Sequence, residues 1–334
     1  METIEIGGPN ILASRIALGT WAIGGWMWGG SDARSAFRTI QTAIDHGINL
    51  IDTAPVYGFG LAEEIVGRAL AANGRRKRIL IATKCGLEWR NAKIHRNASP
   101  ARIAAEVDES LKRLHTDYID IYHLHWPDPV VPIEETAGAF AKLLQDGKIR
   151  AIGVSNLDRA QTERFRQIAP VRTTQPPYNL FEREIEADLL PYAKASGLVV
   201  LAYGALCRGL LSGRMSSATR FDGDDLRRVD PKFQQPRFNQ YLAAVSALDG
   251  FSRANFGKSV LALALRWILD GGPTVALWGA RRPDQLDAIA EVTGWSLDES
   301  SMREIDRILH DTITRPVGPE FMAPPQTAAE SLVA

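Results

Sequence analysis

This chain has few cysteines, no net charge and no long hydrophobic run. Its 334 residues include two cysteines, Cys85 and Cys207, too few for a disulfide framework and typical of a reducing compartment. Lys plus Arg and Asp plus Glu each total 39, so no excess of charge indicates a nucleic-acid or membrane partner. No apolar run approaches the roughly 18 residues of a membrane span. The first residues lack a basic segment followed by an apolar one, so we expect no signal peptide and a cytoplasmic location.

Patterns typical of metal sites and interdomain linkers are also missing. The six histidines are scattered without the spacing of metal ligands, so we expect no metal. No low-complexity tract interrupts the chain. We therefore expect a single domain over residues 1–334 and, because no interface is visible, a monomer.

Short apolar runs alternate with amphipathic segments of helical length along most of the chain. A β-hairpin is predicted at the start, around Gly7-Gly8-Pro9-Asn10. Eight strand–helix repeats follow it. The predicted strands are 16–18, 48–51, 78–84, 118–125, 149–156, 172–175, 198–203 and 273–277. The predicted helices are 32–46, 62–71, 100–114, 133–145, 158–168, 185–196, 258–269 and 283–292.

Repeated strand–helix units predict a parallel sheet of the α/β class. Eight of them in a chain of this length favour a closed (β/α)8 TIM barrel, here with an N-terminal hairpin and an extra C-terminal helix and tail. Residues 215–240 break the rhythm with charged residues, a glycine and two prolines. We interpret them as a long excursion between the seventh strand and its helix, and expect it to become ordered when a ligand binds.

Polar residues lie where several predicted strands end. Asp52, Lys84 and His125 end the second, third and fourth strands, and Tyr57 follows in the loop after Asp52. The next three strands end in Ser155-Asn156, Gln175 and Tyr203. Because barrel enzymes carry their catalytic groups at the carboxyl ends of the strands, we expect all of these side chains to converge on one face.

The first four of these residues suit the protonation of an oxygen atom. A phenol has a pKa of about 10, and a neighbouring ammonium lowers it. Lys84 is a candidate for that neighbour of Tyr57, with Asp52 holding the lysine and His125 orienting a carbonyl. A cofactor must supply the accompanying hydride. Lys84 is alternatively an imine-forming lysine of a barrel aldolase, which borohydride trapping of substrate would reveal.

Several spaced motifs together resemble the aldo-keto reductase superfamily over about residues 3–325. They are "NLIDTAPVYG", "ATKCG", "HLHWPDP", "GVSN", "QPPYNL" and "ALWGARRPDQL". The family is a (β/α)8 barrel that binds NAD(P)H without a G-x-G-x-x-G fingerprint, and no such fingerprint follows a strand here. The resemblance implies a catalytic tetrad of Asp52, Tyr57, Lys84 and His125. "CRGLLSG" and "PVGPEFMAPP" are most similar to the bacterial general-stress branch, which includes an NADPH-dependent glycerol dehydrogenase.

The resemblance also implies a site for NADPH or NADP. It places Tyr203 under the nicotinamide, the loop 204–214 along the pyrophosphate and Arg281 on a 2′-phosphate. Lys232 in the excursion is expected to close over the cofactor. The full set of implied cofactor residues is Thr20, Trp21, Asp52, Ser155, Asn156, Gln175, Tyr203, Gly204, Leu206, Cys207, Arg208, Gly209, Arg214, Lys232, Gly279, Arg281 and Gln285.

A carbonyl substrate needs an apolar pocket beside these groups. "WAIGGWMWGG" supplies tryptophans after the first strand, and Trp126 follows His125. The expected substrate residues are Trp21, Trp28, Tyr57, His125 and Trp126. His123 lies on the same side of its strand as His125 and is expected deeper in the core, and the two cysteines are expected to pack as small apolar residues.

The implied function is an NADP-dependent aldo-keto reductase, an alcohol dehydrogenase of the glycerol type. It would reduce short aldehydes and ketones and oxidise small alcohols or polyols in reverse, with Tyr57 as general acid and base. The alternative is an NADPH-binding regulatory subunit with little turnover. Potassium-channel β subunits are similar to this sequence but typically have asparagine where this chain has His125, so His125 favours the enzyme.

Overall fold

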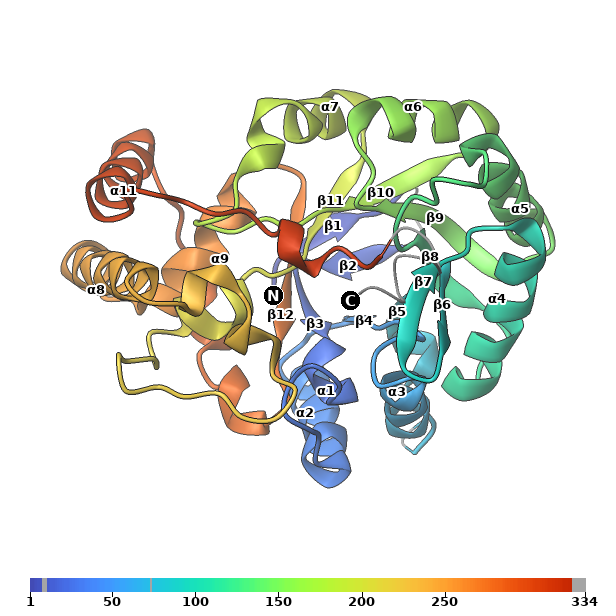
Figure 1. Cartoon of the computed structure of the whole chain (residues 1–334), viewed down its shortest axis with the longest axis horizontal. Coiled ribbons are helices and arrows are strands. Elements are labelled where there is room, and N and C mark those ends of the chain that lie inside the picture. The colour runs from blue at the N-terminus through green and yellow to red at the C-terminus, as the bar shows by residue number, and fades with distance from the viewer. Residues whose placement is uncertain (8–10, 73, 326–334) are drawn as a thin grey trace.

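A computed structural model describes residues 1–7, 11–72 and 74–325, and its centre is a closed barrel of eight parallel strands. Around the barrel the strands follow one another in chain order, and the last pairs with the first (Figure 1). Their bounds are β3 Ile16–Gly19, β4 Leu50–Asp52, β5 Leu80–Cys85, β8 Ile119–Leu124, β9 Ile149–Ser155, β10 Val171–Gln175, β11 Val199–Ala202 and β12 Thr274–Gly279. The predicted (β/α)8 fold is confirmed.

Helices surround this barrel, and side-chain caps fix where several of them begin. Asp32, Ser99 and Ser259 accept hydrogen bonds from backbone N–H groups of the first helical turn. Asp158 and Gln161 form a complete capping box. The helices between strands are α1 Trp21–Gly24, α2 Ala33–Asp45, α3 Leu61–Ala71, α4 Pro100–Leu114, α5 Ile133–Gln145, α6 Arg159–Ile168, α7 Leu189–Ser196, α8 Arg237–Phe256 and α9 Val260–Asp270.

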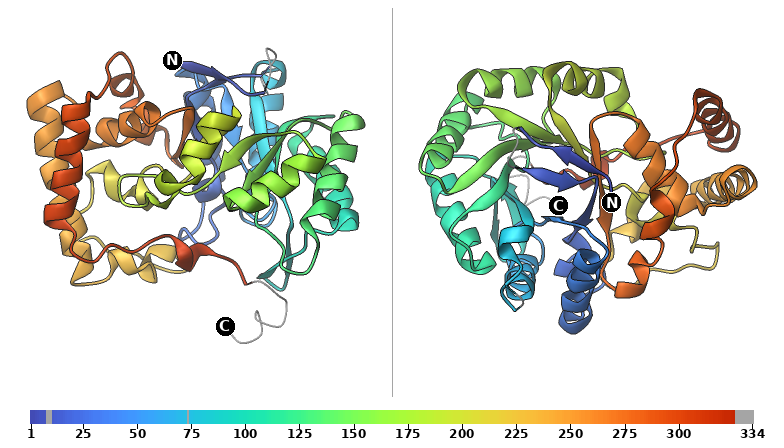
Figure 2. Two further views of the ribbon diagram at one scale, coloured as in Figure 1. Left: turned by 90° about the horizontal axis from the view of Figure 1, so that it is seen from above. Right: turned by 180° about the vertical axis from the view of Figure 1, so that it is seen from behind.

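The two ends of the barrel are covered by different segments. The predicted hairpin is present as β1 Thr3–Glu5 and β2 Leu12–Ser14, although its turn at residues 8–10 lies outside the described residues. Figure 2 shows this hairpin at one end of the barrel and the C-terminal segment at the opposite end. Ile6, Ile11 and Ala13 pack with barrel residues such as Ala17 and Leu50, so the hairpin seals the end away from the strand carboxyl termini.

The chain after the last strand is helical before it becomes irregular. The helix predicted at 283–292 is divided into the 3-10 turn η6 Pro283–Leu286 and α10 Ile289–Val292. The expected extra helix is α11 Glu299–Thr312, which lies beside α8 outside the barrel (Figure 1). Residues 313–325, with the 3-10 turn η7 Glu320–Met322, then lead back toward the mouth of the barrel.

Two elements depart from the sequence-based expectation. An antiparallel hairpin of β6 Leu87–Arg90 and β7 Lys93–Arg96 precedes α4. The excursion ends earlier than expected, because residues 237–240 already belong to the 20-residue helix α8. We call residues 215–236 the strap; it contains the 3-10 turns η4 Leu226–Arg228 and η5 Pro231–Phe233. Among the described residues, no helix combines the length and apolarity needed to cross a membrane.

Candidate active site

The expected tetrad comes together at the carboxyl ends of the strands. Asp52 is paired with Ala82 across β4 and β5, and Lys84 lies two residues further along β5, so both side chains point into the barrel. Lys84 Nζ lies 2.6 Å from Asp52 Oδ1 and donates a second hydrogen bond to Thr53 O at 2.9 Å. The pair is shielded from solvent, with Lys84 0% and Asp52 3% exposed.

Tyr57 is held in place by a close approach of two backbone segments. A Cβ at Gly24 of α1 would lie 2.5 Å from the Tyr57 carbonyl carbon, and one at Gly58 would lie 2.2 Å from Gly24 O. Gly58 also has a φ of +65°, which L side chains rarely adopt. The resulting loop places the Tyr57 ring with its centroid 4.9 Å from Lys84 Nζ and 5.9 Å from the centroid of the His125 ring.

The protonation states of these groups differ in part from the sequence-based argument. Burial, and then the charge of Asp52, raise the pKa of Tyr57 well above 10, whereas we had expected Lys84 to lower it. Burial also lowers the pKa of Lys84, an effect that the charge of Asp52 opposes. Burial and the charge of Lys84 lower the pKa of His125 well below 6.5. At neutral pH the site therefore presents a protonated phenol and a neutral imidazole.

His123 lies one layer deeper in the barrel, as predicted. Its Nε2 is 3.0 Å from Thr173 Oγ1, and a Cβ at Gly153 would lie 2.3 Å from its ring. Burial lowers the pKa of His123 to about 3, so it is a neutral core residue. Cys85 and Cys207 are also buried, and burial raises the pKa of both thiols, consistent with packing rather than reactivity.

The residues expected around a nicotinamide form a hydrogen-bonded arc beside the tetrad. Gln175 Nε2 donates to Asp52 Oδ2 at 2.8 Å, and Ser155 Oγ donates to Gln175 O at 2.7 Å. Tyr203 Oη donates to Asn156 Oδ1 at 2.9 Å. These contacts hold side chains that line the cavity beside Tyr57 in fixed positions.

Two cavities meet at Trp21, Tyr57, Tyr203 and Met322. The first, which we call the substrate cavity, has a volume of about 440 Å³ and is open to Tyr57 and His125. The hairpin β6–β7 and the C-terminal segment form much of its wall, and Arg96 Nη2 donates to Pro324 O at 3.1 Å to join the two. Its main apolar residues are Trp21, Trp26, Val56, Leu87, Ile94, Trp126, Phe321 and Met322.

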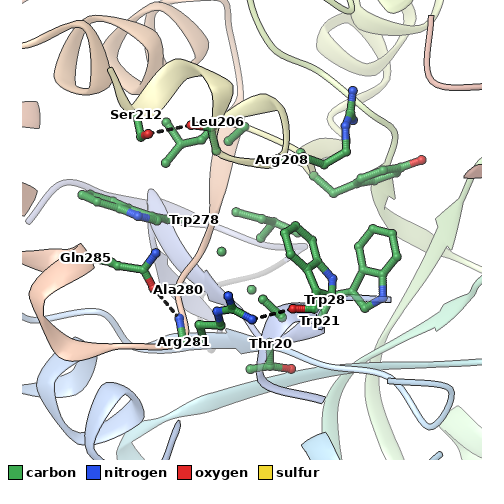
Figure 3. A pocket seen from close by; sticks show the side chains of 18 of the residues that line it. Thr20, Trp21, Trp28, Leu206, Arg208, Ser212, Trp278, Ala280, Arg281 and Gln285 are labelled. Atoms are coloured by element: carbon green, nitrogen blue, oxygen red, sulfur yellow. Dashed lines mark hydrogen bonds between the residues drawn. The ribbon is translucent and has the colours of Figure 1, made fainter. Parts of the chain in front are cut away.

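The second cavity, which we call the cofactor groove, has a volume of about 320 Å³. It runs between the loop after β11 and the ends of β3 and β12, and Figure 3 shows Leu206 and Ser212 on one wall and Trp278, Arg281 and Gln285 on the other. Trp28 Nε1 is buried beside it and has no hydrogen-bond partner among the described residues. Five arginines line it: Arg208, Arg214, Arg227, Arg281 and Arg282. An elongated anion with one flat end, such as a nicotinamide dinucleotide, fits this set of donors.

Most residues expected to bind the cofactor line one of the two cavities, and three residues are placed differently from expectation. Cys207 lines neither cavity. Lys232 is 0% exposed; its Nζ lies 2.8 Å from Glu182 Oε1 and donates to Gly318 O, so it anchors the C-terminal segment. Trp28 lines the cofactor groove, not the substrate cavity where it was expected.

Comparison with known proteins agrees with this geometry. The aldo/keto reductase family model matches residues 15–310. The chain belongs to the aldo/keto reductase family. Its members are carbonyl-reducing oxidoreductases that use a nicotinamide cofactor, and the resemblance identified from the motifs is confirmed.

Several relatives match over nearly their whole length. The aldo-keto reductase YhdN of Bacillus subtilis is 57% identical over 97% of this chain and 98% of its own. An NADH-specific methylglyoxal reductase of Escherichia coli is 36% identical over 92% of this chain and 99% of its own. The solved glycerol dehydrogenase of Gluconobacter oxydans is 54% identical, with a TM-score of 0.88, over 96% of this chain and 99% of its own. An aldo-keto reductase of Klebsiella pneumoniae solved with NADPH is 29% identical, with a TM-score of 0.72, over 95% of this chain and 97% of its own.

Several lining residues were missed by the sequence reasoning. Leu87 and Ile94 come from the hairpin β6–β7, which was not predicted, and Phe321 and Met322 come from a tail predicted only as irregular. Arg227, which lines the cofactor groove, was not singled out because it lies among many charged residues of the strap. The one available signal was the alternating "LEWR" and "KIHR" on either side of Asn91-Ala92, which is typical of a two-residue hairpin turn.

Proposed function

We propose that this chain is an NADPH-dependent oxidoreductase of short aldehydes and ketones, which also oxidises small alcohols or polyols such as glycerol in reverse. The observation that carries the proposal is the position of Tyr57 and His125. Both open into an apolar cavity, directly above a lysine–aspartate pair sealed from solvent. A carbonyl compound that enters the cavity meets the protonated phenol of Tyr57 and the neutral imidazole of His125. The rest of the cavity wall is mostly apolar and offers few hydrogen bonds to water.

Each member of the tetrad has a distinct role in this proposal. Tyr57 donates its proton to the carbonyl oxygen during reduction and takes it back during oxidation. Lys84 stabilises the negative charge that develops on the phenol oxygen, and Asp52 holds the lysine in position through the 2.6 Å contact. His125, neutral because its pKa is lowered, orients the carbonyl by a hydrogen bond.

The cofactor groove supports NADPH as the partner of this chemistry. When bound, NADPH supplies the hydride for the carbonyl carbon. Tyr203 and the arc of Ser155, Asn156 and Gln175 would hold the nicotinamide, and Arg281 beside Gln285 would hold the 2′-phosphate. The NADPH complex of the Klebsiella relative supports this choice, while the NADH-specific Escherichia coli relative makes a comparison of both cofactors necessary.

The decisive experiment follows the absorbance of the reduced cofactor with NADPH and then NADH over a panel of short aldehydes, ketones and sugars. Glycerol with NADP tests the reverse direction. We expect NADPH consumption in the wild type and a loss of about a hundredfold or more in Tyr57→Phe, because the variant keeps the ring but lacks the acid. The control is Tyr118→Phe, which removes a phenol that lines neither cavity and should leave turnover unchanged.

Three results would count against the proposal. Wild-type turnover in Tyr57→Phe would exclude the phenol as the acid. Tight NADPH binding without consumption of any carbonyl would favour the regulatory-subunit alternative. Borohydride-stable attachment of a carbonyl compound to Lys84 would favour an aldolase.

A further inference from the structure

Three segments that are far apart in the sequence wall the substrate cavity, and one arginine joins them. The segments are the hairpin β6–β7, the loop after β8 that carries Trp126, and the C-terminal segment, residues 313–325. Figure 1 shows the C-terminal segment crossing the mouth of the barrel toward the hairpin. Arg96, the last residue of β7, lies where all three segments meet.

The guanidinium of Arg96 contacts both of the other segments. Its Nη1 donates to Pro127 O at 2.9 Å, and its Nη2 donates to Pro324 O at 3.1 Å. The guanidinium carbon also lies 5.1 Å from the centroid of the Trp126 ring, within the range of a cation–π interaction. Arg96 is half-buried and is not one of the described residues that line the cavity. It therefore acts on the cavity only through the residues that it holds.

The part of the C-terminal segment that reaches the cavity is held at both of its ends. Gly318 O accepts a hydrogen bond from the buried Lys232 at 2.8 Å, and Pro324 O accepts the one from Arg96. Pro324 has no backbone N–H, so its carbonyl is the only main-chain group that can anchor that residue. Phe321 and Met322 lie between the two anchors and line the cavity. Loss of the Arg96 anchor would leave these two side chains tied at one end only.

The wall that Arg96 joins is mostly apolar, and the hydrogen-bonding groups of the cavity lie elsewhere. The polar side chains Ser155, Asn156 and Gln175 gather beside Tyr57 and His125, while Lys93 is exposed near the tip of the hairpin. The volume of about 440 Å³ lies in the range of pockets that enclose drug-sized ligands, roughly 300–1,000 Å³. An aromatic ring that extends from the carbonyl would be buried against this wall. A hydroxyl group in the same place would lose its hydrogen bonds to water without replacement.

We propose that Arg96 is a positioning residue that sets substrate selectivity. By joining β7, the Trp126 loop and the C-terminal segment, it forms the apolar wall that favours carbonyl compounds with an aromatic group over small polyhydroxy carbonyls. This inference rests on the proposed function and ranks the substrates within it. Small polyhydroxy compounds still reach the tetrad, but with a higher KM.

The test is steady-state kinetics at saturating NADPH with benzaldehyde and with glyceraldehyde. The wild type should have a kcat/KM for benzaldehyde about tenfold or more above that for glyceraldehyde. Arg96→Met keeps an apolar stem against Trp126 and removes the guanidinium. It should raise the KM for benzaldehyde about fivefold or more, with little change in kcat, in the KM for glyceraldehyde or in the Kd of NADPH. Arg90→Met is the matched control, because Arg90 lies on the same hairpin, is exposed and lines neither cavity.

A second variant removes part of the wall without touching the latch. Phe321→Ala should give the same kinetic pattern, and the double variant Arg96→Met with Phe321→Ala should lose little more than the larger single loss, because both act through one wall. A wild type that prefers glyceraldehyde, or an Arg96→Met variant in which both aldehydes lose equally, would overturn the proposal. If either occurs while carbonyl reduction still depends on Tyr57, the proposed function stands without this inference. If the wild type reduces neither aldehyde with NADPH, both fail.

Discussion

The Asp52–Lys84 pair, to which we assign a role in the proposed reaction, is buried at a cost in stability. Two charges removed from water cost several kcal/mol each, and only close geometry and further hydrogen bonds offset that cost. Here Thr53 O and Gln175 Nε2 provide the additional hydrogen bonds. The pair therefore contributes little to stability. Asp52 instead holds the charged Lys84 beside Tyr57, as the proposed reaction requires.

Removing one partner of this pair should destabilise the protein more than removing both. Lys84→Met leaves Asp52 buried without its counter-ion, and we expect a loss of about 3–5 kcal/mol in the free energy of unfolding. The double variant Asp52→Asn with Lys84→Met should recover much of that stability and remain inactive. Denaturant unfolding followed by fluorescence measures the first effect and NADPH consumption the second. Equal stability of the wild type and Lys84→Met would contradict the expectation.

A second buried carboxylate predicts a pH dependence of stability. Glu106 of α4 is 1% exposed and accepts a hydrogen bond from Gly86 N at 2.9 Å. Burial raises its pKa from 4.5 to about 8, although Arg102 opposes the shift. Between about pH 4.5 and pH 8, Glu106 is therefore protonated in the folded state and ionised in the unfolded state. The stabilising contribution is complete below about pH 4.5 and is lost as the pH rises through about 8.

Glu106→Gln should remove this loss of stability at rising pH, because the side-chain amide stays neutral. Its oxygen can still accept the hydrogen bond from Gly86 N. We expect the Tm of the variant relative to the wild type to rise between about pH 5 and pH 8, by about 2 °C or more. Thermal unfolding at several pH values gives the comparison. Glu64→Gln, at an exposed position of α3, serves as the control. A Tm difference that does not change with pH would show that Glu106 ionises normally in the folded state.

At the scale of elements, the strap supplies part of the wall of the cofactor groove through Met215 and Arg227. Its residue Asp224 bonds to backbone groups 197 and 195 residues earlier in the sequence. On its other side, Lys232 joins it to Gly318 of the C-terminal segment and to Glu182. One strap thus links the cofactor groove to the segment that walls the substrate cavity.

We expect bound NADPH to protect the strap from proteolysis, because both faces of the groove then contact the ligand. Asp224→Ala should increase the rate of tryptic cleavage within residues 215–236 and weaken NADPH binding. Asp222→Ala is the control, since no side-chain hydrogen bond of Asp222 to a described residue is present. Mass spectrometry of timed digests locates the cuts. Equal cleavage with and without NADPH would exclude ordering of the strap by the cofactor.

Most barrel elements could be predicted from sequence because their signals are local. Strands such as Val199–Ala202 are buried on both faces and appear as continuous apolar runs, and the helices carry caps such as Ser99 and Asp158. Helix α8 was missed because its polar and apolar residues show little periodicity before Gly257. The hairpin β6–β7 was missed because its strands are short and half exposed.

Across the whole molecule, the hairpin that covers the core and the candidate active site lie at opposite ends of the barrel. The hairpin β1–β2 seals the end away from the strand carboxyl termini, while the strap, the hairpin β6–β7 and the C-terminal segment surround the catalytic end. This separation is the usual division of labour in (β/α)8 barrels. It allows the two properties to be changed independently.

Ile6→Ala should therefore reduce stability without changing chemistry. The side chain is 0% exposed, and its truncation should cost about 2–5 kcal/mol. The KM and kcat of the folded fraction should equal those of the wild type. Leu12→Ala, at a 49% exposed position of the same hairpin, should have little effect on either property. A change in KM for the carbonyl would show that the two ends are coupled.

The sequence by itself determined the barrel and predicted that the four side chains of the proposed tetrad meet at one end of it. Strand alternation decides which face a side chain occupies, and closure of the barrel brings the strand ends together, so Asp52, Lys84 and His125 could be assigned from their positions along their strands. Only the tertiary structure decided that Arg227 and Trp28 lie at the cofactor groove while Lys232 is buried. It also decided that the pKa of Tyr57 is raised. Those outcomes depend on contacts between distant segments and on desolvation, neither of which leaves a local pattern in the sequence.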